Sequence, residues 1–315
     1  MNDQDEVRWI AGFWRRIGAF LIDSIILGIV GLGLGLIFEM QFVQLGGWGR
    51  LVGFIIALLY FGILNSKISG GQTFGKKLAG IRVVSSGNQT IEVWRSFARY
   101  SILGIPFFLN GARFTTDAMT SFWIYSLAFV IFGGLLSTAY LYVFNRTTRQ
   151  MLHDLLVGTY VVNADSMEHH TGAVWRPHLI VVGILFLASG IAPAFTMKLA
   201  VREPFRDMLS VMAALSSHPA VSHVAVSSGT ATKSFFGENT QSSTFITVRV
   251  SLDHDSVSDA ELARELAIML ADNHSHLDQI DTVQIVLIYG YDIGIASKWI
   301  SQLHSYRPDE LRNED

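Results

Sequence analysis

Long apolar stretches separated by polar segments fill residues 1–198. Four of them are long enough to cross a bilayer, because a membrane helix needs about 20 predominantly apolar residues. They are Ile17–Phe38, Trp48–Asn65, Thr120–Phe144 and Pro177–Met197. This pattern predicts an α-helical polytopic membrane domain with about four to five transmembrane helices.

A fifth apolar stretch, Ser101–Ala112, is short and contains Pro106. As a helix it would reach about 18 Å, whereas the hydrocarbon core is about 30 Å thick. We expect it to cross only if it includes Phe97–Tyr100, with the Arg99 side chain extending towards the membrane surface.

A weak internal repeat bears on the number of crossings. Residues 72–84, "QTFGKKLAGIRVV", align with residues 150–162, "QMLHDLLVGTYVV". Two similar amphipathic segments are most simply placed on one face of the membrane, so an even number of crossings separates them. Ser101–Ala112 is then expected to cross or partly re-enter. The identical pairs are Gln72/Gln150, Leu78/Leu156, Gly80/Gly158, Val83/Val161 and Val84/Val162.

The pattern changes after the last apolar stretch. Apolar residues recur at helical spacing over Pro204–Ser216 and Ser258–Asn273, and a final helix is expected over Ile295–Leu303. Between these segments, apolar and polar residues alternate with a period of two, which is typical of strands. Ser258 and Glu261 form a predicted capping box. The expected strands are Ser222–Val226, Phe245–Leu252 and Val283–Tyr289. The sequence therefore predicts a small soluble α+β sandwich domain.

Charge supports the same division. The chain is 50% hydrophobic and 16% charged, against about 25% charged residues in ordinary globular domains. Residues 1–198 carry a net charge of +5, and residues 199–315 carry −8. We predict a transmembrane domain over residues 1–163, a linker and last transmembrane helix over 164–198, and a soluble domain over 199–315.

Composition also narrows the chemistry. The chain has no cysteine, which excludes disulfides, thiolate zinc sites and cysteine nucleophiles. The soluble part has no basic cluster that would favour nucleic acid. We find no hydrolase signature and no metal-site spacing, so we expect a protein that is not an enzyme and holds no cofactor or metal.

Basic residues predict the orientation. With a cytoplasmic N-terminus, the inside segments hold 12 Lys and Arg residues and the short outside loops hold two, Arg50 and Arg113. Five crossings then place the C-terminal domain in the periplasm or outside the cell. Three basic residues just after the last apolar stretch oppose this assignment: Lys198, Arg202 and Arg206.

One charge lies inside the first apolar stretch. Asp23 follows Arg16 by seven residues, so both lie on one helix face, and a lone charge in hydrocarbon costs at least ~2.5–3.5 kcal/mol. Asp23 is therefore either an ion or proton site or part of a buried structural charge network.

In the same stretch, Gly31 and Gly35 are one turn apart and predict close helix packing.

The segment "GGQTFGKK", residues 70–77, is similar to a phosphate-binding loop. Lys77 stands where magnesium binding requires Ser or Thr, and no strand precedes the segment. We interpret it as a cationic amphipathic segment at the inner lipid surface.

Three segments together resemble the signature motifs of the RDD family of bacterial membrane proteins: "FWRRIGAFLID", "GGQTFGKKLAGIRVV" and "RQMLHDLLVGTYVV". The resemblance covers about residues 8–163. It implies that the arginine and two aspartates naming the family are Arg16, Asp23 and Asp154, and it places the chain in a bacterial inner membrane. Supporting motif residues are Gly75, Lys76, Gly80, Arg82, His153 and Gly158.

The resemblance implies transport, since some family members are assigned as sodium/proton antiporters. We expect Asp154 to pair with Arg16 at the inner surface, which leaves Asp23 one layer deeper as an exchangeable carboxylate. One hypothesis is a transporter of small cations coupled to protons, acting as a homo-oligomer in the lipid bilayer. The alternative is a non-catalytic assembly, sensor or scaffold protein whose residues 203–315 bind a protein partner.

Overall fold

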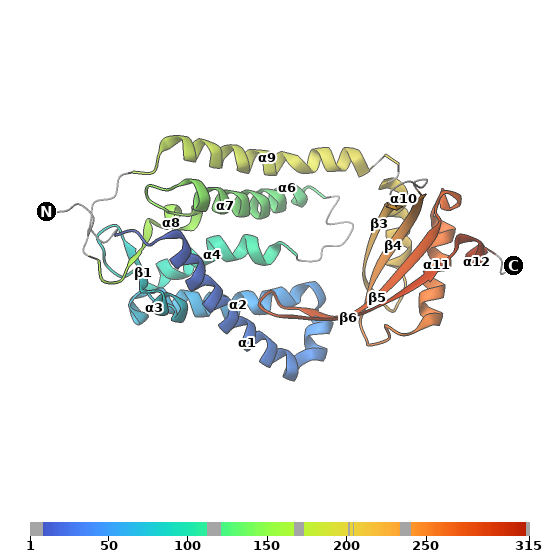
Figure 1. Ribbon diagram of the computed structural model, residues 1–315, viewed down its shortest axis with the longest axis horizontal. Helices are drawn as coiled ribbons and strands as arrows, with labels where there is room; N and C mark the ends of the chain where they lie inside the picture. Colours follow the sequence, from blue (N-terminus) through green and yellow to red (C-terminus); the bar gives the residue numbers. More distant parts are fainter. Residues whose placement is uncertain are drawn as a thin grey trace. The chain divides into compact units, whose positions relative to one another are not determined.

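The computed structural model describes residues 9–111, 121–166, 173–200, 202–203, 205–233 and 241–312. The chain divides into two compact units. Unit 1 contains residues 1–37, 47–193 and 293–296, and unit 2 contains residues 38–46, 194–292 and 297–315. Figure 1 labels most helices and strands of both units. Several predicted endpoints and basic residues lie outside the described residues: Arg8, Ala112, Arg113, Thr120 and Pro204.

Apolar helices make up most of unit 1. Three stretches of the described residues are long and apolar enough to cross a membrane, Phe13–Leu64, Trp123–Phe144 and Arg176–Leu199. The polytopic helical architecture predicted from the sequence is confirmed. The helices are α1 (Phe13–Leu45, with non-helical backbone at Phe38), α2 (Gly49–Leu64), α4 (Val93–Leu109), α6 (Trp123–Ala128), α7 (Gly134–Phe144) and α9 (Arg176–Ala200). Short 3-10 and π turns join them at η1 (Gly46–Trp48), η2 (Lys67–Ser69) and η3 (Phe129–Gly133).

Helix α4 contains most of the short apolar stretch Ser101–Ala112, whose crossing of the membrane depends on the length of its helix. It begins at Val93 and therefore includes Phe97–Tyr100, as a crossing would require. Its 17 residues would span about 25 Å at 1.5 Å per residue. Helices α4 and α2 pack against each other, with Tyr100 stacked on Phe61 at 4.8 Å between ring centroids.

The internal repeat forms two copies of one small motif. Helix α3 (Phe74–Leu78) leads into strand β1 (Ile81–Ser85), and helix α8 (Leu152–Val157) leads into strand β2 (Thr159–Asn163). The strands pair antiparallel, with Val83 opposite Val161. A glycine in the left-handed region stands between each helix and its strand, Gly80 at φ 63° and Gly158 at φ 66°, which is why glycine is required there.

The two copies also share a side-chain contact. Gln72 Nε2 donates to the carbonyl oxygen of Ile81 at 2.9 Å, and Gln150 Nε2 donates to that of Thr159 at 2.9 Å. Each glutamine therefore holds the start of its own strand. Because the copies are equivalent position by position, Lys76 of the first corresponds to Asp154 of the second.

Unit 2 contains a four-stranded sheet in the order β3-β4-β5-β6. Its strands are β3 (Val221–Lys233), β4 (Gln241–Leu252), β5 (Thr282–Asp292) and β6 (Ser297–Tyr306). Strands β4 and β5 are parallel and the other neighbours are antiparallel. The helical elements are α10 (Phe205–Leu215), α11 (Ala260–Asn273), η4 (Leu277–Gln279) and α12 (Pro308–Arg312).

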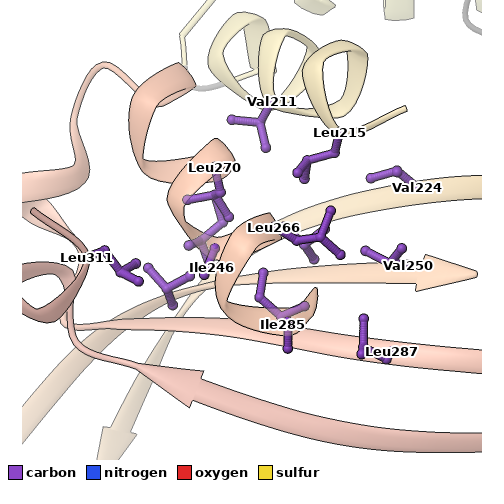
Figure 2. Close-up of a cluster of buried hydrophobic side chains, with 14 of the residues drawn as sticks. Val211, Leu215, Val224, Ile246, Val250, Leu266, Leu270, Ile285, Leu287 and Leu311 are labelled. Atoms are coloured by element: carbon purple, nitrogen blue, oxygen red, sulfur yellow. The ribbon is translucent and has the colours of Figure 1, made fainter. Parts of the chain in front are cut away.

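Helices α10 and α11 cover one face of this sheet and bury its core. Figure 2 shows Val211 and Leu215 of α10 facing Leu266 of α11 and Ile285 of β5. Inward residues alternate along the strands, as in Ile246, Val248 and Val250 of β4, all fully buried. The predicted α+β sandwich is confirmed.

Two local predictions in unit 2 were wrong. The helix expected over Ile295–Leu303 is strand β6, which pairs antiparallel with β5 and places Leu303 opposite Val286. The spacing of its apolar residues fits a helix, but pairing with a neighbouring strand overrides local preference. The N-cap of α11 is Asp259, which accepts from the backbone N–H groups of Glu261 and Leu262, each at 3.0 Å.

Candidate functional site

A closed charge network surrounds Asp154 in unit 1. The Asp154 side chain is fully buried. Arg16 of α1 donates to Asp154 Oδ2 at 3.0 Å, and Arg99 of α4 donates to Oδ1 at 2.7 Å. The hydroxyl of Thr159 adds a third donor at 2.9 Å. The predicted pairing of Asp154 with Arg16 is confirmed.

The second arginine of this network corrects a prediction. Arg99 was expected to extend to the membrane surface, but its side chain is only 9% exposed and ends on Asp154. A carboxylate on the neighbouring motif satisfies the guanidinium better than a long reach to water, because paired and hydrogen-bonded charges tolerate burial. Sequence reasoning missed the contact because Arg99 lies outside all three motifs.

Local backbone structure positions Asp154. It is the third residue of α8, where its carboxylate also accepts from the N–H of Met151 at 3.3 Å. Arg16 donates in addition to the backbone oxygen of Arg149, just before the helix. The positive charges of Arg99 and Arg16 hold the pKa of Asp154 well below its usual range against the opposing effect of burial. Asp154 therefore stays ionised.

Asp23 lies in a separate cage of neutral donors. Its side chain is buried, with 1% exposed. Tyr60 Oη donates to Oδ1 at 2.7 Å, and the N–H of Gly75 donates to the same oxygen at 2.8 Å. Thr73 Oγ1 donates to Oδ2 at 2.6 Å. Residues of α2 and of the turn leading into α3 are thereby attached to the middle of α1.

Gly75 is the tightest point of this cage. An added Cβ would overlap the carbonyl oxygen of Ala19 and lie 3.0 Å from Cγ of Asp23. Thr73 has a second role as the N-cap of α3, accepting from the N–H of Lys76 at 3.2 Å. The "TFGKK" motif therefore presents one hydroxyl and one backbone N–H to Asp23, and glycine lets the backbone approach.

A cavity of about 310 Å³ is lined both by Asp23 and by Arg16 and Arg99 of the Asp154 network. Apolar side chains from α1, α4 and α7 form most of its wall, including Phe20, Leu103 and Leu135. The polar and charged residues that line it are Arg16, Asp23, Asn65, Lys76, Arg99, Tyr100, Thr138, Tyr142 and His153. The cavity thus brings together residues from all three motifs of the sequence.

Lys76 contributes an ammonium group to this cavity. Its Nζ lies 5.7 Å from the centroid of the Phe61 ring, a cation–π contact. Burial is the main cause that lowers the pKa of Lys76 to about 7, the charge of Arg99 lowers it further, and the charge of Asp23 opposes the shift. The sequence named Lys76 only as a supporting motif residue.

His153 adds a buried ring with a defined tautomer. Arg99 Nη2 lies 3.0 Å from His153 Nε2. Because a guanidinium only donates, Nε2 accepts and the ring proton is on Nδ1, which has no hydrogen-bond partner among the described residues. Burial lowers the pKa of His153 to about 3, so the ring is neutral at physiological pH.

The other predicted residues lie away from the cavity. Arg82 is on β1, where Nη2 donates to Asn88 Oδ1 at 3.3 Å. Gly31 and Gly35 are buried residues of α1, and their role in helix packing stays a prediction. Within the described ranges, no group of three or more His, Asp or Glu residues could hold a metal ion.

Comparison with known proteins places these features in context. Residues 10–158 match the model of the RDD family. The chain is similar to uncharacterized protein YckC of Bacillus subtilis (strain 168), with 28% identity over 163 residues, 52% of this chain and 91% of YckC. It is also similar to uncharacterized protein YxaI of the same organism, with 29% identity over 126 residues, 32% of this chain and 82% of YxaI. No solved structure matches the chain.

Proposed function

We propose that the chain is a membrane transporter that exchanges small cations for protons, with Asp23 as its exchangeable carboxylate, since residues 10–158 match the model of the RDD family. One observation carries the proposal: a cavity of about 310 Å³ is lined by Asp23, Lys76, Arg16 and Arg99. Ionisable groups inside a membrane domain that line a cavity are typical of ion and proton pathways.

The two aspartates have different roles in this proposal. Asp154 is held by two arginines and serves as a fixed charge. Asp23 has three neutral donors, and an ionised carboxylate offers about four acceptor positions. One position on Oδ2 thus remains for a cation that enters the cavity, and none of the three donors neutralises the charge of Asp23.

We further propose the setting in which the transporter works. It lies in a bacterial inner membrane with a cytoplasmic N-terminus, and the C-terminal domain lies outside the cytoplasm. The excess of basic residues in the inside segments supports this orientation. A homo-oligomer would supply the helices that a single RDD domain lacks for a two-repeat transporter.

Exchange in reconstituted vesicles tests the proposal. The full chain is placed in liposomes with a pH-sensitive dye and an acid interior, and Na⁺, K⁺, Li⁺ or choline is added outside. We expect small alkali cations to dissipate the pH gradient and choline to leave it intact. Asp23→Asn should abolish the exchange, whereas Asp165→Asn, at an exposed aspartate after β2, should behave as wild type.

A second function is favoured by the number of protein donors that hold each aspartate, three on Asp23 and at least three on Asp154. Such closed networks also fix helix packing, and the chain would then act as a membrane-anchored assembly, sensor or scaffold protein whose residues 203–315 bind a protein partner. If wild type moves no cation and Asp23→Asn loses folded protein, the charged residues are structural and this second function replaces the transporter.

A further inference from the structure

We infer that Lys76 carries the exchanged proton, while Asp23 stays ionised and binds the cation. The inference rests on the proposed exchange function and names the group that couples the two ions. It reassigns the proton from the carboxylate to the amine across the same cavity.

The position of Lys76 is the first argument. Lys76 and Asp154 occupy equivalent positions in the two copies of the repeat, and Asp154 has two arginine partners. Among the described residues, Lys76 forms no ion pair with a carboxylate, and its ammonium faces the ring of Phe61. An ammonium that contacts an aromatic ring and lines a cavity can lose its proton without breaking an ion pair.

The donors around Asp23 are the second argument. The N–H of Gly75 is fixed by the start of α3 and points at Oδ1, which also accepts from Tyr60. The hydroxyl of Thr73 points at Oδ2. Each of these hydrogen bonds is strongest to an ionised carboxylate. Protonation of Asp23 would weaken all three and would loosen the attachment of α3 to α1.

Charge balance is the third argument. With the arginines, the lysine and both aspartates ionised, Arg16, Arg99 and Lys76 carry three positive charges, while Asp23 and Asp154 carry two negative charges. His153 is neutral, so the net charge is +1. A monovalent cation would raise it to +2 inside this mostly apolar cavity. Loss of one proton from Lys76 restores +1, so cation entry and proton release are coupled one to one.

The exchange step balances without any redox partner. The cation approaches the free acceptor position of Asp23, one N–H bond of the Lys76 ammonium breaks, and the electron pair stays on the nitrogen. The proton leaves to water, and the neutral amine faces the bound cation. When the cation departs, a proton rebinds to the amine and the site returns to its first state.

The groups that face Lys76 favour this exchange near neutral pH. They are Arg16 and Asp23 of α1, Arg99 of α4, and His153 and Asp154 of α8. Burial and the positive neighbours lower the pKa of Lys76 to about 7. The charge of Lys76 therefore changes within the physiological range of pH.

Cation binding and proton release, measured on the same sample, test the inference. Purified full-length protein in weakly buffered detergent receives Na⁺ at pH values on both sides of about 7. Bound ²²Na⁺ and released protons are both counted. Wild type should release close to one proton per cation on the acid side, and its Na⁺ affinity should fall about tenfold per unit of acidification there.

Two substitutions and a control separate the outcomes. Lys76→Met should bind Na⁺ with no proton release and no pH dependence. Lys76→Arg should bind no Na⁺ at any of these pH values, because arginine keeps its charge. Lys77→Met alters the adjacent exposed lysine and should match wild type.

Other results would overturn either the proposed exchange function or the role of Lys76 as proton carrier. If wild type binds no cation, the proposed exchange function fails. If wild type exchanges and Lys76→Met still releases a proton on cation binding, Asp23 is the proton carrier and this inference fails. Should Lys76→Met not fold, Lys76→Arg decides the case, because exchange at the wild-type rate in that variant would overturn the inference.

Discussion

At the scale of single residues, the site contains two aspartates held in different ways. Asp154 takes charged donors from two helices, whereas Asp23 takes a phenol, a hydroxyl and a backbone N–H. The sequence predicted the pairing of Asp154 with Arg16 because both are ionisable and lie in motifs. It could not predict the donors to Asp23, since Tyr60 and Gly75 carry no charge that would single them out.

Removal of the buried charge of Asp154 should destabilise the membrane domain. We expect Asp154→Asn to lower the free energy of unfolding by about 3–5 kcal/mol, because it leaves two buried arginines without their counterion. Thermal unfolding of the protein in detergent measures the effect. Asp165→Asn removes an exposed charge and should shift the melting temperature little, so equal shifts in the two variants would contradict the network.

His153 predicts a dependence of stability on pH. Its pKa is about 6.5 in the unfolded chain and about 3 in the folded protein, so the folded state disfavours the proton. The contribution of the neutral ring is complete above pH 6.5 and is lost as the pH falls from 6.5 towards 3, by up to about 1.4 kcal/mol per unit.

Denaturation at a series of pH values measures this slope. We expect His153→Gln to flatten the slope between about pH 6.5 and 4. The matched control is His276→Gln, in unit 2, where the ring is exposed. A wild-type slope that survives His153→Gln would assign the proton uptake to another group.

At the scale of elements, the repeated helix–glycine–strand motif positions the site. Its two copies form the small sheet and place Lys76 and Asp154 at equivalent positions. Sequence alignment was sufficient to find the repeat, because Gln72/Gln150 and Gly80/Gly158 are identical and have structural roles. It did not predict that β1 and β2 pair with each other, since strand pairing between distant segments leaves no local pattern.

The fit of α3 against α1 is the element-scale prediction. Gly75→Ala should destabilise the membrane domain by about 1–3 kcal/mol, because the added methyl group forces α3 away from Ala19 and Asp23. Gly87→Ala provides the control, as an added Cβ there meets nothing within 4 Å. Melting temperatures of both variants in detergent test the expectation, and equal stability would mean that the helices separate without cost.

The secondary structure was predicted wrongly where contacts with distant segments override the local pattern of apolar residues. The segment 295–303 has apolar residues at helical spacing, but its backbone pairs with β5. The neighbouring helix α11 was predicted correctly because its amphipathic face is long and one side of it, including Leu266 and Leu270, is fully buried. A long amphipathic helix gives a periodic signal that packing does not override.

At the scale of the whole molecule, unit 2 has a core of its own. Helices α10, α11 and α12 and the four-stranded sheet bury a continuous cluster that includes Val250, Leu266 and Leu287 (Figure 2). We therefore expect residues 203–315 to fold alone with a cooperative melt followed by circular dichroism. Leu266→Ala should lower the stability by about 2–5 kcal/mol, and a fragment without a cooperative transition would contradict an independent domain.

The side of the membrane on which this domain lies is the last prediction. The 12-to-2 excess of Lys and Arg in the inside segments outweighs Lys198, Arg202 and Arg206 after the last span, because the rule counts all short loops together. A reporter active only outside the cytoplasm, fused after residue 315, should be active. The same reporter fused within residues 145–150, before α8, should be silent. An active cytoplasmic reporter at the C-terminus would reverse the assignment and require an even number of crossings.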